Sequence, residues 1–273
     1  MSGDRYQEVV PPPALRPFVR MIWTYEAAEP TGDVQRIAPD GCPELILHAA
    51  EPYEEQAPDG SWRTQPRTLF AGQLTRPLAL RPTGPVDLIA VRFEPDGARD
   101  WFGRPMTEAT DRALDASGLV LDLERPDDRA ARLAAILRWL EDRSRSWRID
   151  PLVRDRIDAA AAALPLPSIS PTERRALQRR FRDRVGAPLQ TLSSVFRFRR
   201  IFDHAAHVGE VVDREAGDWL RAGLEAGYFD QPQMARDFRR FLGCTATEWA
   251  RGQMALARRI ASQSYKPEAD APG

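Results

Sequence analysis

Cysteine, histidine and lysine are all scarce in this chain of 273 residues. The two cysteines, Cys42 and Cys244, exclude a disulfide framework and a zinc site built from several cysteines. Three histidines are too few for a metal centre built mainly from imidazoles, so we expect no metal and no cofactor. Lys266 is the only lysine, and every other basic residue is an arginine, whose planar charged group suits phosphates and guanine edges.

Long apolar runs are missing as well. No segment approaches the ~18 consecutive apolar residues that a membrane-spanning helix needs, and residues 1–10 lack the apolar core of a signal peptide. We therefore expect a cytoplasmic protein with no membrane partner. Hydrophobic residues make up 42% of the chain, which is enough for a core of ordinary size, and the length favours two domains.

The first part of the chain, up to about residue 115, predicts strands and turns. Runs rich in β-branched and aromatic residues are separated by turn signals such as Pro39-Asp40-Gly41, and they lie at 18–25, 43–48, 67–71, 78–81 and 86–93. Short strands spaced roughly ten residues apart are typical of an antiparallel sandwich or barrel. The polar residues 51–66 predict a long hairpin loop.

The remainder of the chain predicts helices, which makes the whole an α+β protein. Residues 127–145 carry an apolar stripe at helical spacing, and this helix is either a dimer seam or a cover for the barrel. An alanine-rich helix over 152–164 ends at Pro165 and Pro167, and further helices follow up to about residue 261. Residues 261–273 predict a disordered tail.

Two related segments stand out in the helical half. Residues 175–182 and 233–240 each contain the pattern apolar-x-Arg-x-Phe-Arg, and a glycine, Gly186 or Gly243, follows the phenylalanine by five residues. Helical spacing places the apolar residue and the phenylalanine of each segment on one buried face. These pairs are Leu177 with Phe181 and Met234 with Phe238, and the arginines and glutamines between them then face outward.

Helix boundaries are marked around both segments. Ser170-Pro171-Thr172-Glu173 fits a capping box before the first segment, and Asp230 can cap the second. The two glycines fit the C-terminal ends of these helices. Residues 219–228 predict a short helix and a glycine turn before the second segment, with Gly223 where the two helices cross, which is a helix-turn-helix arrangement. Trp219 and Tyr228 are expected in the core.

Several spaced residues agree with a known signature. They are Ala-Gly-Tyr-Phe-Asp-Gln at 226–231, Arg-Asp-Phe-Arg-Arg at 236–240 and Gly-Cys-Thr at 243–245, together with residues 175–181. This pattern resembles that of AraC/XylS-type transcriptional regulators, and it covers about 150–253 of the chain. The N-terminal half is similar, over 39–45, 71–77 and 91–97, to the strand-rich, cupin-like sensor domain of some members.

The resemblance implies a fold and a mode of action. An antiparallel β barrel or sandwich would precede two helix-turn-helix units, joined by a long helix over 189–208 that spans ~30 Å. The two recognition helices would enter successive major grooves, ~34 Å apart, on one face of promoter DNA. The chain would then be a sequence-specific, non-enzymatic transcription factor at the nucleoid with double-stranded DNA as its partner. Further expected partners are a small-molecule effector, a second copy of the chain and, for an activator, RNA polymerase.

The resemblance also assigns site residues. The positions that match base-reading residues are Arg175, Gln178 and Arg179 on the first recognition helix and Gln231, Gln233 and Arg236 on the second. Arginine suits guanine and glutamine suits adenine, because each offers paired hydrogen bonds. Phosphate contacts that set the register are expected from Arg182, Arg239 and Arg240. Arg179 and Arg236 have the alternative of structural ion pairs.

The distribution of charge supports a division of the chain. Residues 1–149 carry 19 basic and 24 acidic side chains, whereas residues 150–260 carry 19 and 14. A basic half beside an acidic half indicates nucleic-acid binding, although the net charge is only −1. The expected division is a sensor or dimerisation domain at 1–122, a connecting helix at 123–149, a DNA-binding domain at 150–260 and the tail.

The sequence departs from the family pattern in three places. Residues 164–171 hold three prolines where the scaffold helix of the first unit should lead into its recognition helix. Ala246 stands in place of a usual proline, and Ala222 in place of a usual leucine. The second unit is therefore the safer DNA reader, and the alternative function is a regulatory or interaction protein with a degenerate first unit. A small-molecule-processing barrel enzyme is a further alternative, although no nucleophile–base pair or phosphate loop is present.

The strand-rich half offers a few candidate ligand residues. Asp40 with Glu44, or Arg92 with Glu94, are candidates for the lining of a pocket. Strand alternation also places Cys42, Glu44 and His48 on one face. Three residues of one strand seldom converge on one metal ion, so we interpret His48 as a sheet residue and Cys42 as an inert thiol.

Overall fold

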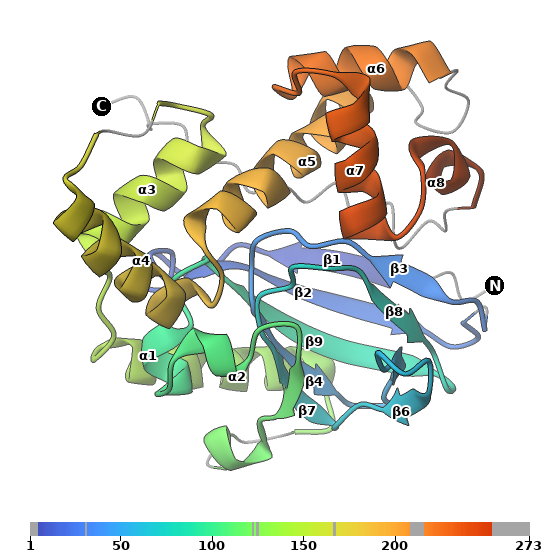
Figure 1. Ribbon diagram of the computed structural model, residues 1–273. Coiled ribbons are helices and arrows are strands. Elements are labelled where there is room, and N and C mark those ends of the chain that lie inside the picture. The colour runs from blue at the N-terminus through green and yellow to red at the C-terminus, as the bar shows by residue number, and fades with distance from the viewer. Residues whose placement is uncertain are drawn as a thin grey trace.

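The computed structural model describes residues 5–30, 32–121, 123, 126–165, 168–207 and 216–252. Within these ranges a strand-rich N-terminal domain precedes a helical C-terminal domain, which confirms the predicted α+β architecture (Figure 1). The predicted tail at 261–273 lies outside the described residues. None of the described helices is both long enough and apolar enough to cross a membrane.

The N-terminal domain contains two antiparallel sheets. The larger has the order β1-β2-β9-β4-β7-β10 and the smaller β3-β8-β5-β6. The larger sheet consists of β1 (Arg5–Val9), β2 (Val19–Ala27), β9 (Val86–Phe93), β4 (Glu44–His48), β7 (Thr68–Ala71) and β10 (Ala113–Asp115). The smaller consists of β3 (Gln35–Ile37), β8 (Leu78–Arg81), β5 (Glu54–Gln56) and β6 (Trp62–Thr64). Among the described strands none pairs across the two sheets, so the domain is a sandwich rather than a closed barrel.

The five strand runs predicted from the sequence are all present. The region 51–66, predicted as a hairpin loop, contains the short strands β5 and β6 of a hairpin. Three further strands, β1, β3 and β10, were not predicted, because β3 and β10 have only three residues each and β1 is mostly polar and exposed. Pairing with a longer neighbour positions them, as β1 does along β2 from Arg5 opposite Glu26 to Val9 opposite Ile22.

Helices cover the outer face of the larger sheet. The elements on this side are α1 (Arg99–Phe102), the 3₁₀ turns η1 (Met106–Glu108) and η2 (Ser117–Leu119), and α2 (Arg129–Ser144). Phe70 of β7 packs against Trp101 of α1 with ring centroids 5.0 Å apart. Ile136 and Leu140 of α2 are buried in the same core. The apolar stripe predicted at 127–145 is therefore a cover for the sheet.

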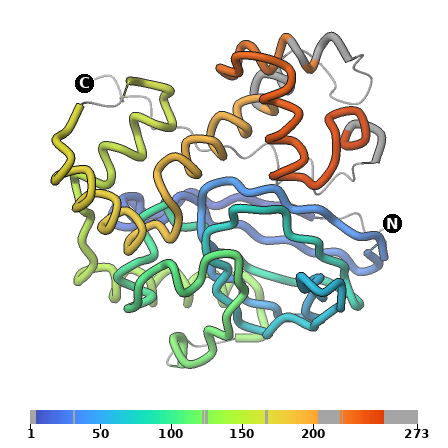
Figure 2. Tube along the Cα trace, viewed as in Figure 1, coloured from blue at the N-terminus to red at the C-terminus, as the bar shows by residue number. Residues whose placement is uncertain are grey.

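The helical domain contains two cores that α5 connects. Its helices are α3 (Pro151–Ala161), α4 (Pro171–Val185), α5 (Leu189–His207), α6 (Ala216–Glu225), α7 (Gln231–Leu242) and α8 (Ala246–Gly252). The first half of α5 packs with α3 and α4 in an aliphatic core around Val153, Ile157 and Phe181. The second half packs with α6, α7 and α8 in an aromatic core around Phe198, Phe202 and Trp219. Figure 2 shows the path of α5 from the side of α3 and α4 to that of α6 and α7.

The two domains contact each other at both ends of the helical domain. Arg99 of α1 donates two hydrogen bonds to Asp183 of α4, at 3.0 and 3.2 Å. The hydroxyl of Thr110 donates to the carbonyl of Gly186 at 2.7 Å. At the other end, Arg36 of β3 donates to the carbonyl of Leu242 at 3.4 Å. Both α4 and α7 therefore end against the N-terminal domain.

Candidate nucleic-acid interface and an enclosed pocket

The first predicted recognition helix is α4, and its ends are as predicted. The Ser170 hydroxyl accepts from the Glu173 amide, and the Glu173 carboxylate accepts from the Ser170 amide, which is a capping box. Gly186 ends the helix in the left-handed region, at φ 87°. Leu177 and Phe181 are buried, so the opposite face of α4 points outward.

That outward face carries the predicted contact residues of the first unit. They are all exposed, and in the described part of the chain their side chains have no hydrogen-bond or ion-pair partner: Arg175, Gln178, Arg179 and Arg182. Arg179 therefore forms no structural ion pair within the described residues, although the sequence allowed one. It is the neighbouring Arg180 that pairs, with Asp150 at the start of α3, at 2.7 Å.

A cleft lies beside α4 where a scaffold helix would normally pack. Between the end of α3 at Ala161 and the start of α4 at Pro171, the described residues contain no helix. The cleft holds about 1520 Å³ of space free of protein atoms, part of it open to solvent. Its described lining includes no carboxylate and four arginines, Arg156, Arg174, Arg182 and Arg197. The prolines predicted to interrupt the first unit thus coincide with an incomplete helix-turn-helix.

The second unit is a complete helix-turn-helix, formed by α6 and α7. Gly223 lies where the helices cross, since a Cβ there would be 2.5 Å from the sulfur of Met234. The Asp230 carboxylate accepts from the Gln233 amide at 2.7 Å, which caps α7 as predicted. Gly243 ends the helix in the left-handed region, at φ 70°.

The predicted contact residues of α7 divide into two groups. Gln231, Arg236 and Arg239 are exposed, and their side chains have no polar partner among the described residues. Arg240 is exposed too and lies over the ring of Phe241, 4.8 Å from its centre. Gln233 differs because it is half-buried and its side-chain oxygen accepts from the Phe229 amide at 3.1 Å.

A buried hydrogen-bond network fixes the inward face of α7. Asp237 is only 8% exposed, and one carboxylate oxygen accepts from Tyr228 at 2.9 Å and from Arg197 of α5 at 3.1 Å. Burial, followed by the charge of Asp237, raises the pKa of Tyr228, so its hydroxyl stays protonated and donates. Composition and spacing predict Tyr228 as core but do not reveal this network, because Arg197 lies on another helix.

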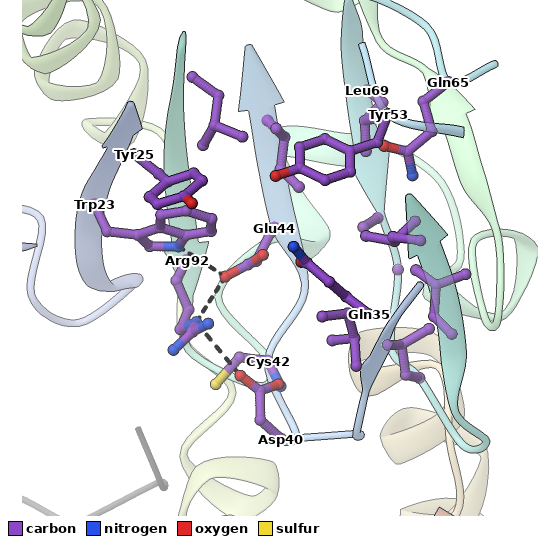
Figure 3. A pocket seen from close by; sticks show the side chains of 18 of the residues that line it. Trp23, Tyr25, Gln35, Asp40, Cys42, Glu44, Tyr53, Gln65, Leu69 and Arg92 are labelled. Atoms are coloured by element: carbon purple, nitrogen blue, oxygen red, sulfur yellow. Dashed lines mark hydrogen bonds and ion pairs between the residues drawn. The ribbon is translucent and has the colours of Figure 1, made fainter. Parts of the chain in front are cut away.

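A pocket lies between the two sheets of the N-terminal domain (Figure 3). It holds about 830 Å³ free of protein atoms, part of it open to solvent. Side chains reach it from β2, β4, β7 and β9 on one side and from β3 and β8 on the other. Asp40, Glu44 and Arg92 line it, as the sequence indicates for a ligand pocket, whereas Glu94 pairs with Arg20 instead.

Three charged side chains meet at one end of this pocket. The Arg92 Nε donates to Glu44 at 2.7 Å and lies 3.4 Å from an Asp40 oxygen. The indole N–H of Trp23 donates to the same Glu44 oxygen at 3.0 Å. Arg92 is opposite Glu44 in the β4–β9 pairing, which explains how residues so distant in the sequence meet.

Cys42, predicted as an inert thiol, and His48, predicted as a sheet residue, also line the pocket. Burial, with a smaller effect of Asp40, raises the pKa of the Cys42 thiol well above its usual value, so the thiol is neutral. His48 is buried, and no described group makes a well-formed hydrogen bond to its ring nitrogens, although the nearby Gln65 side chain acts to raise its pKa. Burial and the charge of Arg67 lower the pKa of His48 to about 4, so this imidazole is neutral at pH 7. Among the described residues no three His, Cys, Asp or Glu side chains gather as metal ligands.

The wall of the pocket touches the helical domain at one glycine. Gly41 lies between the lining residues Asp40 and Cys42, and its φ is 90°. A Cβ at this position would lie 2.6 Å from the ring of Phe196 on α5. The Gln73 side chain donates to the Gly41 carbonyl at 2.9 Å. The pocket and the connecting helix α5 are therefore in direct contact.

Comparison with known proteins adds one domain match. Residues 7–115 match a domain of unknown function, DUF6597, which is less than half of the chain. No curated protein matches the sequence.

Several solved structures of ToxT from Vibrio cholerae are similar in outline. One is 7% identical and covers 90% of this chain and 97% of its own, with a TM-score of 0.43. Another, bound to (E)-4-(8-methylnaphthalen-1-yl)but-3-enoic acid, is 8% identical and covers 83% and 96%, with a TM-score of 0.44. A third, bound to an unsaturated fatty acid, is 8% identical over 83% and 93%, with a TM-score of 0.43. A likeness at this level does not establish a common function.

Proposed function

We propose that the chain is a sequence-specific DNA-binding regulator of transcription and that α7 is its principal reader. The observation that carries this proposal is the exposed face of α7, where Gln231 and Arg236 have no partner among the described residues. This face belongs to a complete helix-turn-helix and matches the AraC/XylS-type signature. Exposed arginine and glutamine on such a helix suit the paired hydrogen bonds that guanine and adenine offer in the major groove.

The rigidity of α7 supports this role. A base reader must be held in place before it meets DNA, because loose side chains lose binding energy when they become ordered. The bonds of Asp237 to Tyr228 and Arg197 fix the buried face of α7 against α5. Arg239 and Arg240, further along the exposed face, are proposed to contact phosphates. Gln233 would read a base only after releasing the Phe229 amide or through its remaining N–H groups.

We assign α4 as a second reader of the same DNA. Arg175, Gln178 and Arg179 are proposed to face bases, and Arg182 to contact phosphate. Their exposure and the basic cleft beside them favour contact with a polyanion. The pocket between the sheets is proposed to hold a small-molecule effector, which would act on α5 through the contact of Gly41 with Phe196. A second copy of the chain and RNA polymerase remain proposed partners.

Selection of bound fragments from genomic DNA, followed by fluorescence anisotropy on the selected site, tests the proposal. We expect Arg236→Ala to weaken specific binding by about 10- to 100-fold, since a bidentate base contact contributes ~1–3 kcal/mol. Arg145→Ala is the matched control, because it removes an equal charge from a residue with 79% side-chain exposure in the N-terminal half. Equal effects of the two variants, or unchanged sequence preference in Arg236→Ala, would contradict the assignment of α7.

A second candidate function follows from the incomplete first unit. Without a scaffold helix among the described residues between α3 and α4, the chain would serve as a regulatory partner that no longer binds DNA. A gel shift with genomic fragments at low salt separates the two functions. Retention of no fragment supports the regulatory partner, and a retained fragment whose affinity falls steeply with salt supports the DNA-binding regulator.

A further inference from the structure

The charged end of the pocket between the sheets carries an excess of negative charge. Asp40, Glu44 and Arg92 have side chains that are 14%, 15% and 3% exposed. One guanidinium offsets only one of the two carboxylates. Cys42 and His48 are neutral at pH 7, and no other charged side chain is among the described residues that line the pocket. A bound molecule would therefore meet a net charge of about −1 in a partly desolvated place, where charge interactions are strong.

One aromatic side chain lies at this charged end, because the Trp23 indole N–H donates to Glu44 at 3.0 Å. Tyr25 and Tyr53 line the pocket nearer to His48, since Tyr25 pairs with Leu88 opposite His48 and the Tyr53 ring lies 6.1 Å from the His48 ring (Figure 3). The faces of such rings carry partial negative charge and attract cations, most strongly for tryptophan. Trp23 beside a carboxylate pair thus suits an organic cation with little water around it.

The remainder of the pocket is largely apolar and ends at the buried imidazole of His48. Its middle is lined by aliphatic side chains, among them Ile46, Leu78 and Leu80. His48 lies four residues from Glu44 along β4, which corresponds to about 13 Å of strand. The Gln65 side chain is close enough to raise the pKa of this imidazole, but no described group makes a well-formed hydrogen bond to either ring nitrogen, so a hydrogen-bonding group of a ligand would satisfy one of them.

We infer that the pocket binds an elongated lipophilic monocation, with its positive head beside Asp40 and Glu44 and a hydrogen-bonding group beside His48. This inference rests on the proposed sensor role of the pocket. An organic carboxylate is disfavoured, because it would lie next to two carboxylates while Arg92 is already engaged by both. The ligand class is therefore opposite in charge to a fatty acid.

Calorimetry on the full chain with decylamine, decanol and decanoate, each below its micelle-forming concentration, tests the sign of the charge. These molecules share one chain and differ only in the head group. We expect the amine to bind about tenfold more tightly than the alcohol, and decanoate to bind most weakly. An amino alcohol of the same length, with its hydroxyl at the far end, is expected to bind more tightly than the plain amine, and His48→Leu should remove that advantage.

Asp40→Asn tests the position of the head group. The asparagine oxygen can still accept from the Cys42 amide, as Asp40 does at 2.9 Å, so the turn is retained. We expect a loss of about tenfold in amine affinity and little change for decanol. Asp59→Asn, which removes an equal charge from an exposed hairpin, is the matched control and should change neither.

Three results would overturn the inference: decanoate binding as tightly as the amine, no binding of any of the four probes, or equal effects of Asp40→Asn and Asp59→Asn. The wild-type series alone decides the ligand class if a variant fails to fold. DNA binding is measured separately on the same protein. Selective amine binding without DNA binding contradicts the proposed regulator but not the ligand class. DNA binding without amine selectivity contradicts the ligand class but not the proposed regulator.

Discussion

The two predicted recognition helices, α4 and α7, share one sequence pattern but differ in the elements that support them. α7 crosses the scaffold helix α6 at Gly223, whereas α4 has no such helix in the described residues that precede it. The N-terminal domain supports α4 instead, through Arg99 and Thr110 at its C-terminal end. A recognition-helix motif therefore specifies the helix itself, its caps and its buried face, but not the element that holds it in place.

The residue before each phenylalanine illustrates the same difference. In α7 it is Asp237, which is buried and bonded to Arg197 of the connecting helix. In α4 it is Arg180, which is half exposed and pairs with Asp150 at the start of α3. In the second unit a buried carboxylate thus bonds α7 to α5, whereas in the first unit an ion pair at the surface bonds α4 to the start of α3.

The largest effects are expected from the two phenylalanines. Phe238→Ala and Phe181→Ala should each lower the free energy of unfolding by about 3–5 kcal/mol, because both rings are fully buried. Phe238→Ala should lower the free energy of unfolding more than Phe181→Ala, since the Phe238 ring contacts those of Phe198, Trp219 and Phe202. Denaturant unfolding measures both costs, and hydrogen exchange in α4 and α7 localises them. A larger cost for Phe181→Ala would contradict the comparison.

The next largest loss of stability is expected from substitutions of Asp237 and Arg180, the residues that precede the two phenylalanines. Asp237→Asn should destabilise the protein by about 2 kcal/mol, because it leaves the Arg197 guanidinium without its carboxylate in a largely buried site. Arg180→Gln should cost under about 1 kcal/mol, since its side chain is 49% exposed and the pair is screened by water. Chemical denaturation of the two variants gives the difference. An equal loss of stability in the two variants would mean that the buried network around Asp237 does not stabilise α7 more than the surface ion pair stabilises α4.

A smaller difference in stability is expected between alanine substitutions at the two glycines that end the helices, Gly186 and Gly243. Alanine in the left-handed region costs about 1–2 kcal/mol at either position. At Gly186 the new Cβ would also lie 2.9 Å from the carbonyl oxygen of Met106, which is backbone and cannot move aside. At Gly243 it would lie 2.8 Å from the flexible end of the Arg36 side chain and at an ordinary contact distance, 3.7 Å, from Pro77. Thermal unfolding should therefore rank Gly186→Ala below Gly243→Ala in stability, and the reverse order would argue against close docking of α4.

The smallest effects are expected at the N-terminal caps. Ser170→Ala and Asp230→Ala each remove one hydrogen bond to a free amide and should cost about 1 kcal/mol. Because both caps are local, these costs should be nearly equal despite the different support of the two helices. Urea titrations check this equality. A much larger cost at Asp230 would show that the two units differ even in their local ends.

Local features of the helices were predictable from the sequence. The capping box at Ser170 and the stops at Gly186 and Gly243 depend on residues within one or two turns of each other. The crossing at Gly223 depends on Met234, only 11 residues further along the chain. The three prolines of residues 164–171 indicated the interruption of the first unit. What replaces the missing support was not predictable, because the bond from Arg99 to Asp183 joins residues 84 positions apart.

The pocket was predictable only in part. Alternation along β4 places Glu44 and His48 on one face, and the sequence named Asp40 and Arg92 as candidates. The aliphatic side chains that β3 and β8 contribute to the lining were missed, because their place depends on how these short strands face the larger sheet. Neither strand has enough length or alternation to indicate its partner, and only the register, with Gln35 opposite Leu80, places them.

The contacts at Gly186 and Leu242 have a further consequence for how the polypeptide is connected. The path from the N-terminal domain through α4, α5 and α7 returns to that domain at Arg36, so the molecule forms a closed circuit. A single break in the chain between α3 and α4 would leave both fragments joined by the remaining contacts. The separation of the two recognition helices is accordingly set twice, once by the length of α5 and once by the N-terminal domain that holds both of their ends.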